Sequence, residues 1–224
     1  ILVDQGPPEA RVASLLRGLG VTRVDAIVLT HPQRDHVGGA VDVLEELSVG
    51  RVLYPGLPHE SRDRDEALRE AAERGVPATT IRRGQVLRAG RLTLEVLWPD
   101  GPGAPHEDPN LRSVVLLVTY GDFELLLTGD AESEVTLPLV IPTVDVLKVA
   151  HHGSADEGLS RLLEELAPKI AVVSVGVRNR FGHPHESTIA ALAARPGLRT
   201  LRTDRDGTIL IETDGSRITA PVGS

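Results

Sequence analysis

Short apolar runs alternate with helix-like segments along the whole chain. These runs have the length and the β-branched content of buried strands. The runs that matter most for function are Val24–Thr30, Phe123–Thr128, Val144–Ala150 and Ile170–Val175. Because hairpins and strand–helix units are mixed, we expect an α+β fold in which helices cover β-sheets in layers. No linker divides the chain convincingly, which predicts one domain over 1–224.

Caps and turn residues indicate where the other elements begin and end. Ser61 predicts the N-cap of a charged helix that ends at Gly75. A second helix is expected at about Val37–Leu47. The stretch Pro99–Pro109 is rich in Pro, Gly and acid, which predicts a loop.

The composition restricts the chemistry that the fold can carry. There is no cysteine, so a metal would need His, Asp or Glu as ligands. The formal net charge is −8, and aromatic residues make up 2% of the chain. Such a chain repels nucleic acid unless a basic patch or a cation intervenes, and it offers few rings on which bases could stack.

The distribution of the histidines is the most informative feature. Six of the eight lie in three pairs, each directly after an apolar strand, and a fourth strand ends in Gly129-Asp130. The pairs are His31/His36, His151/His152 and His183/His185. Ligands are commonly bound outside the carboxyl ends of strands, so we expect the four strand ends to converge on one metal site.

Each segment has a purely structural alternative when it is considered alone. Asp35 could cap the helix that follows it, although Gly38-Gly39 permits a close backbone approach that favours a site. Gly129-Asp130 could be a strand-end turn. The pair His151-His152 could be satisfied polar residues, and the segment Gly182-His183-Pro184-His185 a surface turn. The four segments together are more specific than any one of them.

These residues resemble a known family. Val28–Gly39 (VLTHPQRDHVGG) looks like the HxHxDH metal motif of metallo-β-lactamase-fold hydrolases, and Leu2–Gly6 and Leu127–Asp130 resemble two other motifs of that fold. A closer resemblance is to the C-terminal domain of ComEC-type DNA-uptake proteins of natural competence. It is carried by Asn110–Leu116, Leu127–Asp130, Leu147–Ser154 (LKVAHHGS) and Phe181–His185 (FGHPH).

The resemblance implies a four-layer αββα sandwich that lacks its first β-hairpin, in a fragment of a larger membrane protein. It implies one or two Mn²⁺ or Zn²⁺ ions. The implied metal ligands are His31, Asp35, His36, Asp130 and one histidine of the 151/152 pair, of which we favour His152. Two departures weaken the first of two metal sites: Gln33 replaces the second histidine of HxHxDH, and the middle motif offers only Asn110 and Ser113.

The implied activity is a nuclease that degrades the non-transported DNA strand. Asp35 positions the metal, His183 protonates the leaving oxygen, and His151 or His185 is the second choice for that proton transfer. Asp4 orients a ligand imidazole, and Gln33 and Ser113 lie nearby or touch substrate. The arginines Arg34, Arg178 and Arg180 could hold the DNA backbone.

The resemblance also implies the surroundings of the chain. The partners would be DNA and the protein's own transmembrane channel domain, and the location the extracytoplasmic face of the membrane. The oligomeric state is not predicted. Two alternatives stay open, namely a small-molecule phosphodiesterase or esterase on the same fold, and a non-catalytic DNA-guiding domain that has lost a metal.

Overall fold

The computed structural model describes residues 1–104 and 107–220. It comprises two compact units, which are unit 1 (Ile1–Arg83 and Trp98–Val114) and unit 2 (Gly84–Leu97 and Val115–Ser224). One domain over 1–224 stays a prediction. The predicted loop Pro99–Pro109 includes residues 105–106, which lie outside the described residues. In the described part of the chain, no helix combines the length and the apolar character needed to cross a membrane.

Unit 1 is built on a small parallel sheet with the strand order β1-β3-β5-β6. Its elements are β1 (Leu2–Val3), η1 (Pro8–Ala10), α1 (Val12–Gly18), β2 (Arg23–Val24), β3 (Ile27–Val28), α2 (Arg34–Val37), α3 (Ala40–Glu46), β4 (Ser48–Val49), β5 (Val52–Tyr54), α4 (Arg62–Glu73), β6 (Ala78–Thr80) and η2 (Pro109–Arg112). Strands β2 and β4 pair separately.

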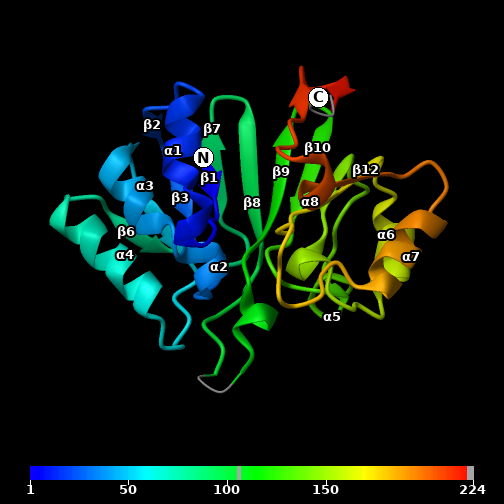
Figure 1. Cartoon of the computed structure of the whole chain (residues 1–224), viewed down its shortest axis with the longest axis horizontal. Coiled ribbons are helices and arrows are strands. Elements are labelled where there is room, and N and C mark those ends of the chain that lie inside the picture. The colour runs from blue at the N-terminus through cyan, green and yellow to red at the C-terminus, as the bar shows by residue number, and fades with distance from the viewer. Residues whose placement is uncertain (105–106, 221–224) are drawn as a thin grey trace. The chain divides into compact units, whose positions relative to one another are not determined.

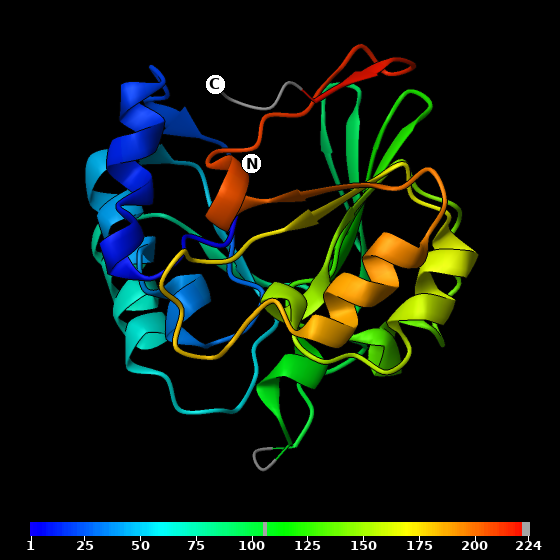
Figure 2. The same ribbon diagram turned by 45° about the vertical axis from the view of Figure 1, so that its right-hand side comes forward.

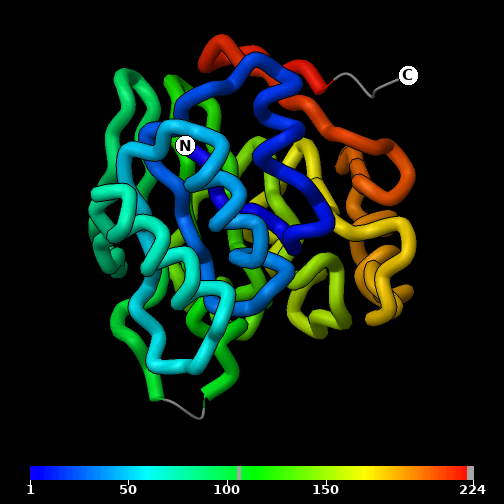
Figure 3. Tube along the Cα trace, turned by 60° about the vertical axis from the view of Figure 1, so that its left-hand side comes forward, coloured from blue at the N-terminus to red at the C-terminus, as the bar shows by residue number. Residues whose placement is uncertain are grey.

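The apolar faces of three helices supply the core of unit 1. Helix α3 packs against both α1 and α4, and the three lie in front of the strands in Figure 3. Ile27, Val43 and Ala67 are completely buried in one cluster, because helical spacing places the apolar side chains of α3 and α4 towards β3. The predicted cap of α4 is confirmed, since the Ser61 hydroxyl accepts a hydrogen bond of 3.3 Å from the Arg64 amide.

The helix predicted over Val37–Leu47 begins later than expected. A short helix, α2, ends at Val37, and α3 begins at Ala40. The two glycines between them permit close packing, because a Cβ on Gly39 would lie 2.5 Å from the carbonyl oxygen of Gln5. The glycines therefore end one helix and start another, and they hold α2 against the segment after β1.

Unit 2 is built on a seven-stranded mixed sheet with the order β13-β12-β11-β10-β9-β8-β7 (Figure 1). Its elements are β7 (Val86–Ala89), β8 (Leu92–Trp98, whose last residue belongs to unit 1), β9 (Val115–Tyr120), β10 (Phe123–Leu127), α5 (Ser133–Thr136), β11 (Val146–Lys148), η3 (Ala150–Gly153), α6 (Leu159–Leu166), β12 (Ile170–Val173), α7 (Glu186–Ala194), β13 (Arg199–Arg202), α8 (Thr203–Asp206), β14 (Glu212–Thr213) and β15 (Ile218–Thr219).

The order of the unit 2 strands places the loops after β10, β11 and β12 at the same edge of the sheet. Strands β10, β11, β12 and β13 are parallel neighbours, so their carboxyl ends share one edge of the sheet. Helices α6 and α7 pack against each other and lie side by side in Figure 2. Helix α6 buries Leu159, Leu162, Leu163 and Leu166, which have the i, i+3, i+4, i+7 spacing of a core-facing helix.

Candidate metal-binding clusters

Unit 1 contains a buried pair of histidines, which we call the unit 1 cluster together with Asp4. His31 follows β3, and His36 lies on α2. Both residues are nearly inaccessible, with exposed fractions of 1% and 2%. Their ring centroids are 4.1 Å apart. Two adjacent buried imidazoles need defined polar contacts, because an unsatisfied polar group in a protein interior is costly.

Asp4 anchors the unit 1 cluster. Its backbone has a positive φ of 55°, which is uncommon for a residue with a side chain. Its carboxylate accepts hydrogen bonds of 2.9 Å from the Thr30 amide and from the Thr30 hydroxyl, and it lies 2.7 Å from Nδ1 of His36. Burial raises the pKa of Asp4, but the charge and hydrogen bond of His36 outweigh it, so the pKa is lowered overall.

These contacts determine the tautomers of both rings. The Asp4 carboxylate can only accept, so Nδ1 of His36 donates to it. The Thr30 hydroxyl uses its one proton on Asp4, so towards Nδ1 of His31, 3.0 Å away, it can only accept. When the rings are neutral, both therefore carry their lone pair on Nε2, the atom with which an imidazole can ligate a metal.

Ser113 reaches the unit 1 cluster from the segment before β9. Its hydroxyl lies 3.2 Å from Nδ1 of His31 and is completely buried. The structure thus places Ser113 against His31, and its predicted role near the metal or the substrate stays a prediction. Nothing in the chain sequence near Ser113 signals this contact, because 82 positions separate the two residues.

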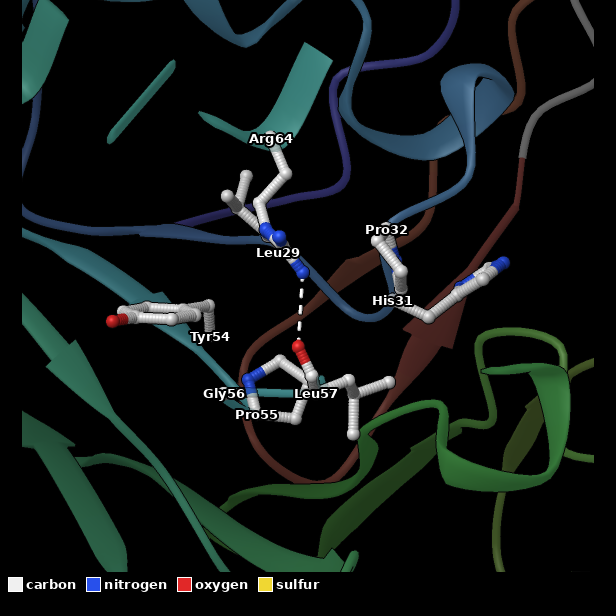
Figure 4. A pocket seen from close by; sticks show the side chains of 8 residues that line it. All are labelled: Leu29, His31, Pro32, Tyr54, Pro55, Gly56, Leu57 and Arg64. Carbon is white, nitrogen blue, oxygen red and sulfur yellow. Dashed lines mark hydrogen bonds between the residues drawn. The ribbon is translucent and has the colours of Figure 1, made fainter. Parts of the chain in front are cut away.

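An apolar pocket adjoins His31 on the side of β5 (Figure 4). Its floor is formed by the turn after β5, and a guanidinium nitrogen of Arg64 donates a hydrogen bond of 2.9 Å to the carbonyl oxygen of Leu57. Arg64 therefore fixes this turn beside His31. The pocket lies beside His31, and none of the residues that line it is acidic.

The two remaining unit 1 candidates are located on α2. Gln33 is the residue that precedes the helix, and its side chain makes no capping bond. Asp35 is the second residue of the helix itself, so the alternative in which Asp35 caps a helix is wrong. Asp35 is partly buried and adjoins His36 in the sequence. Its metal role stays a prediction.

The carboxyl edge of the unit 2 sheet carries the second set, which we call the unit 2 cluster. It consists of Asp130 after β10, His151 and His152 in η3 after β11, and His183 after β12. The Asp130 side chain is completely buried. Its Oδ2 lies 3.9 Å from Nε2 of His151 and 3.8 Å from Nε2 of His152. The convergence of strand ends is therefore observed for three strands of this sheet.

Hydrogen bonds at the far side of each ring determine the tautomers here too. Nδ1 of His152 lies 2.7 Å from the carbonyl oxygen of Ser174, which can only accept. Nδ1 of His151 lies 2.8 Å from a carboxylate oxygen of Glu132. Burial raises the pKa of Glu132, but hydrogen bonds from His151 and Ser154 outweigh it, so the pKa is lowered and the group is an acceptor at neutral pH.

The unit 2 cluster therefore directs acceptor atoms towards one another. When the rings are neutral, both Nε2 lone pairs face the buried Asp130 carboxylate. Acceptor atoms in such an arrangement require positive charge between them, either as ring protons or as a cation. Imidazole nitrogen and carboxylate oxygen are suitable ligands for Zn²⁺ and Mn²⁺, so the residues fit the predicted metal. His151 and His152 lie at almost equal distances, so the choice between them stays open.

Backbone strain accompanies this cluster. His151 and His152 both have positive φ angles, of 46° and 53°. Such conformations cost free energy in residues with a Cβ and occur where the surroundings enforce them, often at functional sites. The turn is held in place by a hydrogen bond of 2.7 Å from the His185 amide to the carbonyl oxygen of Gly153. A Cβ on Gly153 would lie 2.7 Å from Cβ of Pro184, so the two segments touch.

His183 and His185 have different surroundings. The ring of His183 lies 5.6 Å from that of His151. Burial and the neighbouring His151 and His152 lower the pKa of His183, which favours a neutral ring and weakens its predicted role as a proton donor at neutral pH. His185 is the N-cap of α7, because its Nδ1 accepts a hydrogen bond of 3.3 Å from the Ser187 amide.

Two residues of unit 2 escaped the sequence analysis. Glu132 orients His151, and its only signal was an additional carboxylate two positions after Asp130. Asn179 holds the backbone around His183, since its side chain accepts hydrogen bonds from the amides of Phe181 and His183. A lone asparagine between two arginines gave no signal of that role.

Comparisons with known proteins agree with this description. A family model described as the metallo-beta-lactamase superfamily matches residues 1–177. ComE operon protein 3 of Bacillus subtilis (strain 168) is 38% identical over 199 residues, which cover 87% of this chain and 25% of that protein. Competence protein ComA of Neisseria gonorrhoeae is 30% identical over 217 residues, which cover 93% of this chain and 28% of that protein. The chain thus spans about a quarter of the length of these relatives.

A solved structure supports the same fold. Tm1679, described as a metal-dependent hydrolase of the beta-lactamase superfamily, has a TM-score of 0.58 to this chain at 16% identity. The match covers 89% of this chain and 84% of that one. At this identity the likeness concerns the fold alone.

Proposed function

Because the chain belongs to the metallo-β-lactamase superfamily, we propose that it is a metal-dependent phosphodiesterase domain that cleaves DNA. The predicted fold of that type is confirmed by the family match and by the solved structures. The likeness to ComEC-type competence proteins is confirmed as well. Membership of the family supports a metal-dependent hydrolase, and the DNA substrate is our proposal.

One observation carries the proposal. In unit 2, two imidazoles whose tautomers are fixed by Glu132 and Ser174 direct their Nε2 atoms towards the buried carboxylate of Asp130. A purely structural role would not require three acceptor groups to face one another. A divalent cation stabilises such an arrangement, and hydrolases of this fold use one for catalysis.

The proposed ligands are those that the sequence predicts. They are His31, Asp35 and His36 from unit 1, and Asp130 and His152 from unit 2, with Mn²⁺ or Zn²⁺ as the metal. A bound divalent metal lowers the pKa of water to about 7 and stabilises negative charge on a phosphoryl oxygen. Whether one or two ions bind follows from metal analysis of the purified chain.

The other residues position the ligands and move protons. Asp4 accepts the Nδ1 proton of His36 and keeps its ring orientation, and Glu132 does the same for His151. His183 lies next to His151, where it can exchange a proton with a reacting oxygen. Its lowered pKa favours the neutral ring, which leaves few protonated rings to act as a donor at neutral pH, so His151 is the alternative donor to the leaving oxygen.

The names of the relatives extend the proposal to DNA uptake. We propose that the chain acts during natural transformation, degrading the strand that is not transported. In that setting its partners are DNA and a transmembrane channel domain, and its location is the extracytoplasmic face of the membrane. Each of these statements rests on the likeness to competence proteins.

A nuclease assay with added Mn²⁺ tests the proposal. Wild type should cleave single-stranded DNA, and Asp35→Ala should lose at least about 10²-fold of that rate, because a displaced metal no longer stabilises the transition state. Glu45→Ala, on the exposed face of α3, is the matched control and should cleave like wild type. Equal cleavage by Asp35→Ala and wild type would mean a contaminant or a wrong site.

A chromogenic phosphodiester, assayed in parallel, distinguishes a nuclease from a small-molecule phosphodiesterase. Hydrolysis of this compound without DNA cleavage would identify a small-molecule phosphodiesterase. A chain that retains no metal and cleaves neither substrate would support the non-catalytic reading.

A further inference from the structure

The segment 176–183, which follows β12, carries an unusual surface feature. Of the five Phe, Trp and Tyr residues of the chain, only Phe181 is exposed, with 77% of its surface accessible. The other phenylalanine, Phe123, is buried in a core cluster. A single exposed apolar side chain is common on protein surfaces, so the contacts that hold this ring and the charges near it decide whether it can bind a ligand.

The ring of Phe181 is held in a defined position. It stacks on His183, with ring centroids 6.1 Å apart and planes inclined by 16°. The backbone on both sides is fixed by the Asn179 side chain, which accepts from the amides of Phe181 and His183 and donates to the carbonyl oxygens of Gly176 and His183. The ring is therefore preorganised, so little conformational entropy of this segment would be lost when a ligand stacks on its outer face.

Two arginines precede the ring in the sequence. Arg178 and Arg180 are both exposed and lie on either side of Asn179 in the sequence. In a chain with a net charge of −8, these two exposed arginines bring positive charge to the segment that carries Phe181. Guanidinium groups bind phosphate through paired hydrogen bonds, and aromatic rings bind bases by stacking.

We propose that the segment 176–183 binds single-stranded nucleic acid, with a base stacked on Phe181 and the flanking phosphates on Arg178 and Arg180. This inference rests on the proposed function and specifies its substrate as a strand with unpaired bases. A base within a duplex already stacks on its neighbours and cannot offer a face to Phe181. His183 in turn contacts His151, with ring centroids 5.6 Å apart and planes inclined by 58°, so a strand bound here would lie next to the unit 2 cluster.

Binding of a fluorescent oligonucleotide tests the inference without turnover. We expect Phe181→Ala, in the presence of a chelator, to weaken the binding of single-stranded DNA by about tenfold to a hundredfold. Phe181→Leu should lose as much, because it keeps the apolar volume but not the ring, and Phe181→Trp should bind like wild type. Val177→Ala is the matched control, since Val177 is an equally exposed apolar residue of the same segment.

An oligonucleotide with an abasic tract isolates the stacking contribution. Wild type and Phe181→Ala should bind it with equal, weak affinity, because no base is present to stack. Arg178→Ala and Arg180→Ala should each reduce the salt dependence of binding by about one phosphate contact, for both oligonucleotides.

Three results would overturn the inference. They are equal binding of base-bearing DNA by wild type and Phe181→Ala, an equal loss on the abasic oligonucleotide, and preferential binding of a blunt duplex. Because binding is measured without metal, a chain that binds as expected but never cleaves would refute the nuclease and leave this inference standing. If the chain cleaves DNA but Phe181→Ala binds it like wild type, the nuclease proposal stands and this inference is refuted.

Discussion

The two clusters hold their histidines by different means. In unit 1, His31 and His36 are almost completely buried, and the side chains of Thr30 and Asp4 contact their Nδ1 atoms. In unit 2, the side chains of His151 and His152 are 29% and 21% exposed, and a strained turn presents them. The first cluster is part of the core, whereas the second is a surface feature supported by a sheet edge. Substitutions should therefore cost stability in the first and mainly binding in the second.

The sharpest test of this contrast is the stability of two alanine variants without metal. His36→Ala leaves the buried Asp4 carboxylate without its imidazole, and we expect a loss of about 3 kcal/mol in the free energy of unfolding. His152→Ala should cost less than about 1 kcal/mol, because its ring is partly exposed. Urea denaturation in the presence of a chelator measures both. Equal losses would show that the two clusters do not differ in this way.

A smaller effect is expected for the residue that orients His36. Asp4→Asn keeps the size of the side chain but weakens the hydrogen bond that fixes the ring, and we expect metal affinity to fall by about tenfold to a hundredfold. Competition with a chromophoric chelator measures this. Asp25→Asn, an exposed surface aspartate, is the control. Unchanged affinity in Asp4→Asn would remove Asp4 from the metal site.

The acid sensitivity of unit 1 gives a third test. The pKa of Asp4 is lowered from 3.8 in the folded protein, because His36 outweighs the effect of burial. A carboxyl group with a lowered pKa stabilises the fold above its unfolded pKa and loses that contribution as the pH falls through its folded pKa. Urea midpoints of metal-free wild type should therefore decline below pH 3.8, and Asp4→Asn should show a shallower decline. Parallel curves would contradict this.

The smallest effect concerns His185. As the N-cap of α7 it should contribute about 0.5 kcal/mol to stability, so His185→Ala should shift the urea midpoint slightly. DNA cleavage should be unchanged if capping is its whole role. A large loss of cleavage at unchanged stability would instead support its predicted role in proton transfer.

Sequence reasoning succeeded where local pattern decides structure. The strand ends, the Ser61 cap and the close approach at Gly39 follow from side-chain chemistry within a few residues. The alternative in which Asp35 caps a helix was wrong, because α2 begins at Arg34, two residues before the start that a cap at Asp35 would require. The role of His185 as a cap was missed because histidine is not among the usual N-cap residues.

Two of the contacts that orient the candidate ligands could not have been predicted from the sequence. Ser113 meets His31 and Glu132 meets His151 only because strands from distant parts of the chain lie next to one another. A single sequence shows which residue types follow a strand, but not which of their side chains will meet. The ligand types were therefore predictable, and the resemblance also placed Asp4 beside a ligand imidazole, whereas the contacts of Ser113 and Glu132 could not be predicted.

The contact between Gly153 and Pro184 has a mechanical consequence. Gly153 lies so close to the Pro184 ring that an added methyl group would clash with it, and Gly153 also accepts the hydrogen bond from the His185 amide, so we expect the two segments to move together. The paired-histidine turn and the start of α7 must therefore travel as one rigid piece. A displacement of the neighbouring segment 176–183, for example on binding a ligand, should therefore also shift His152.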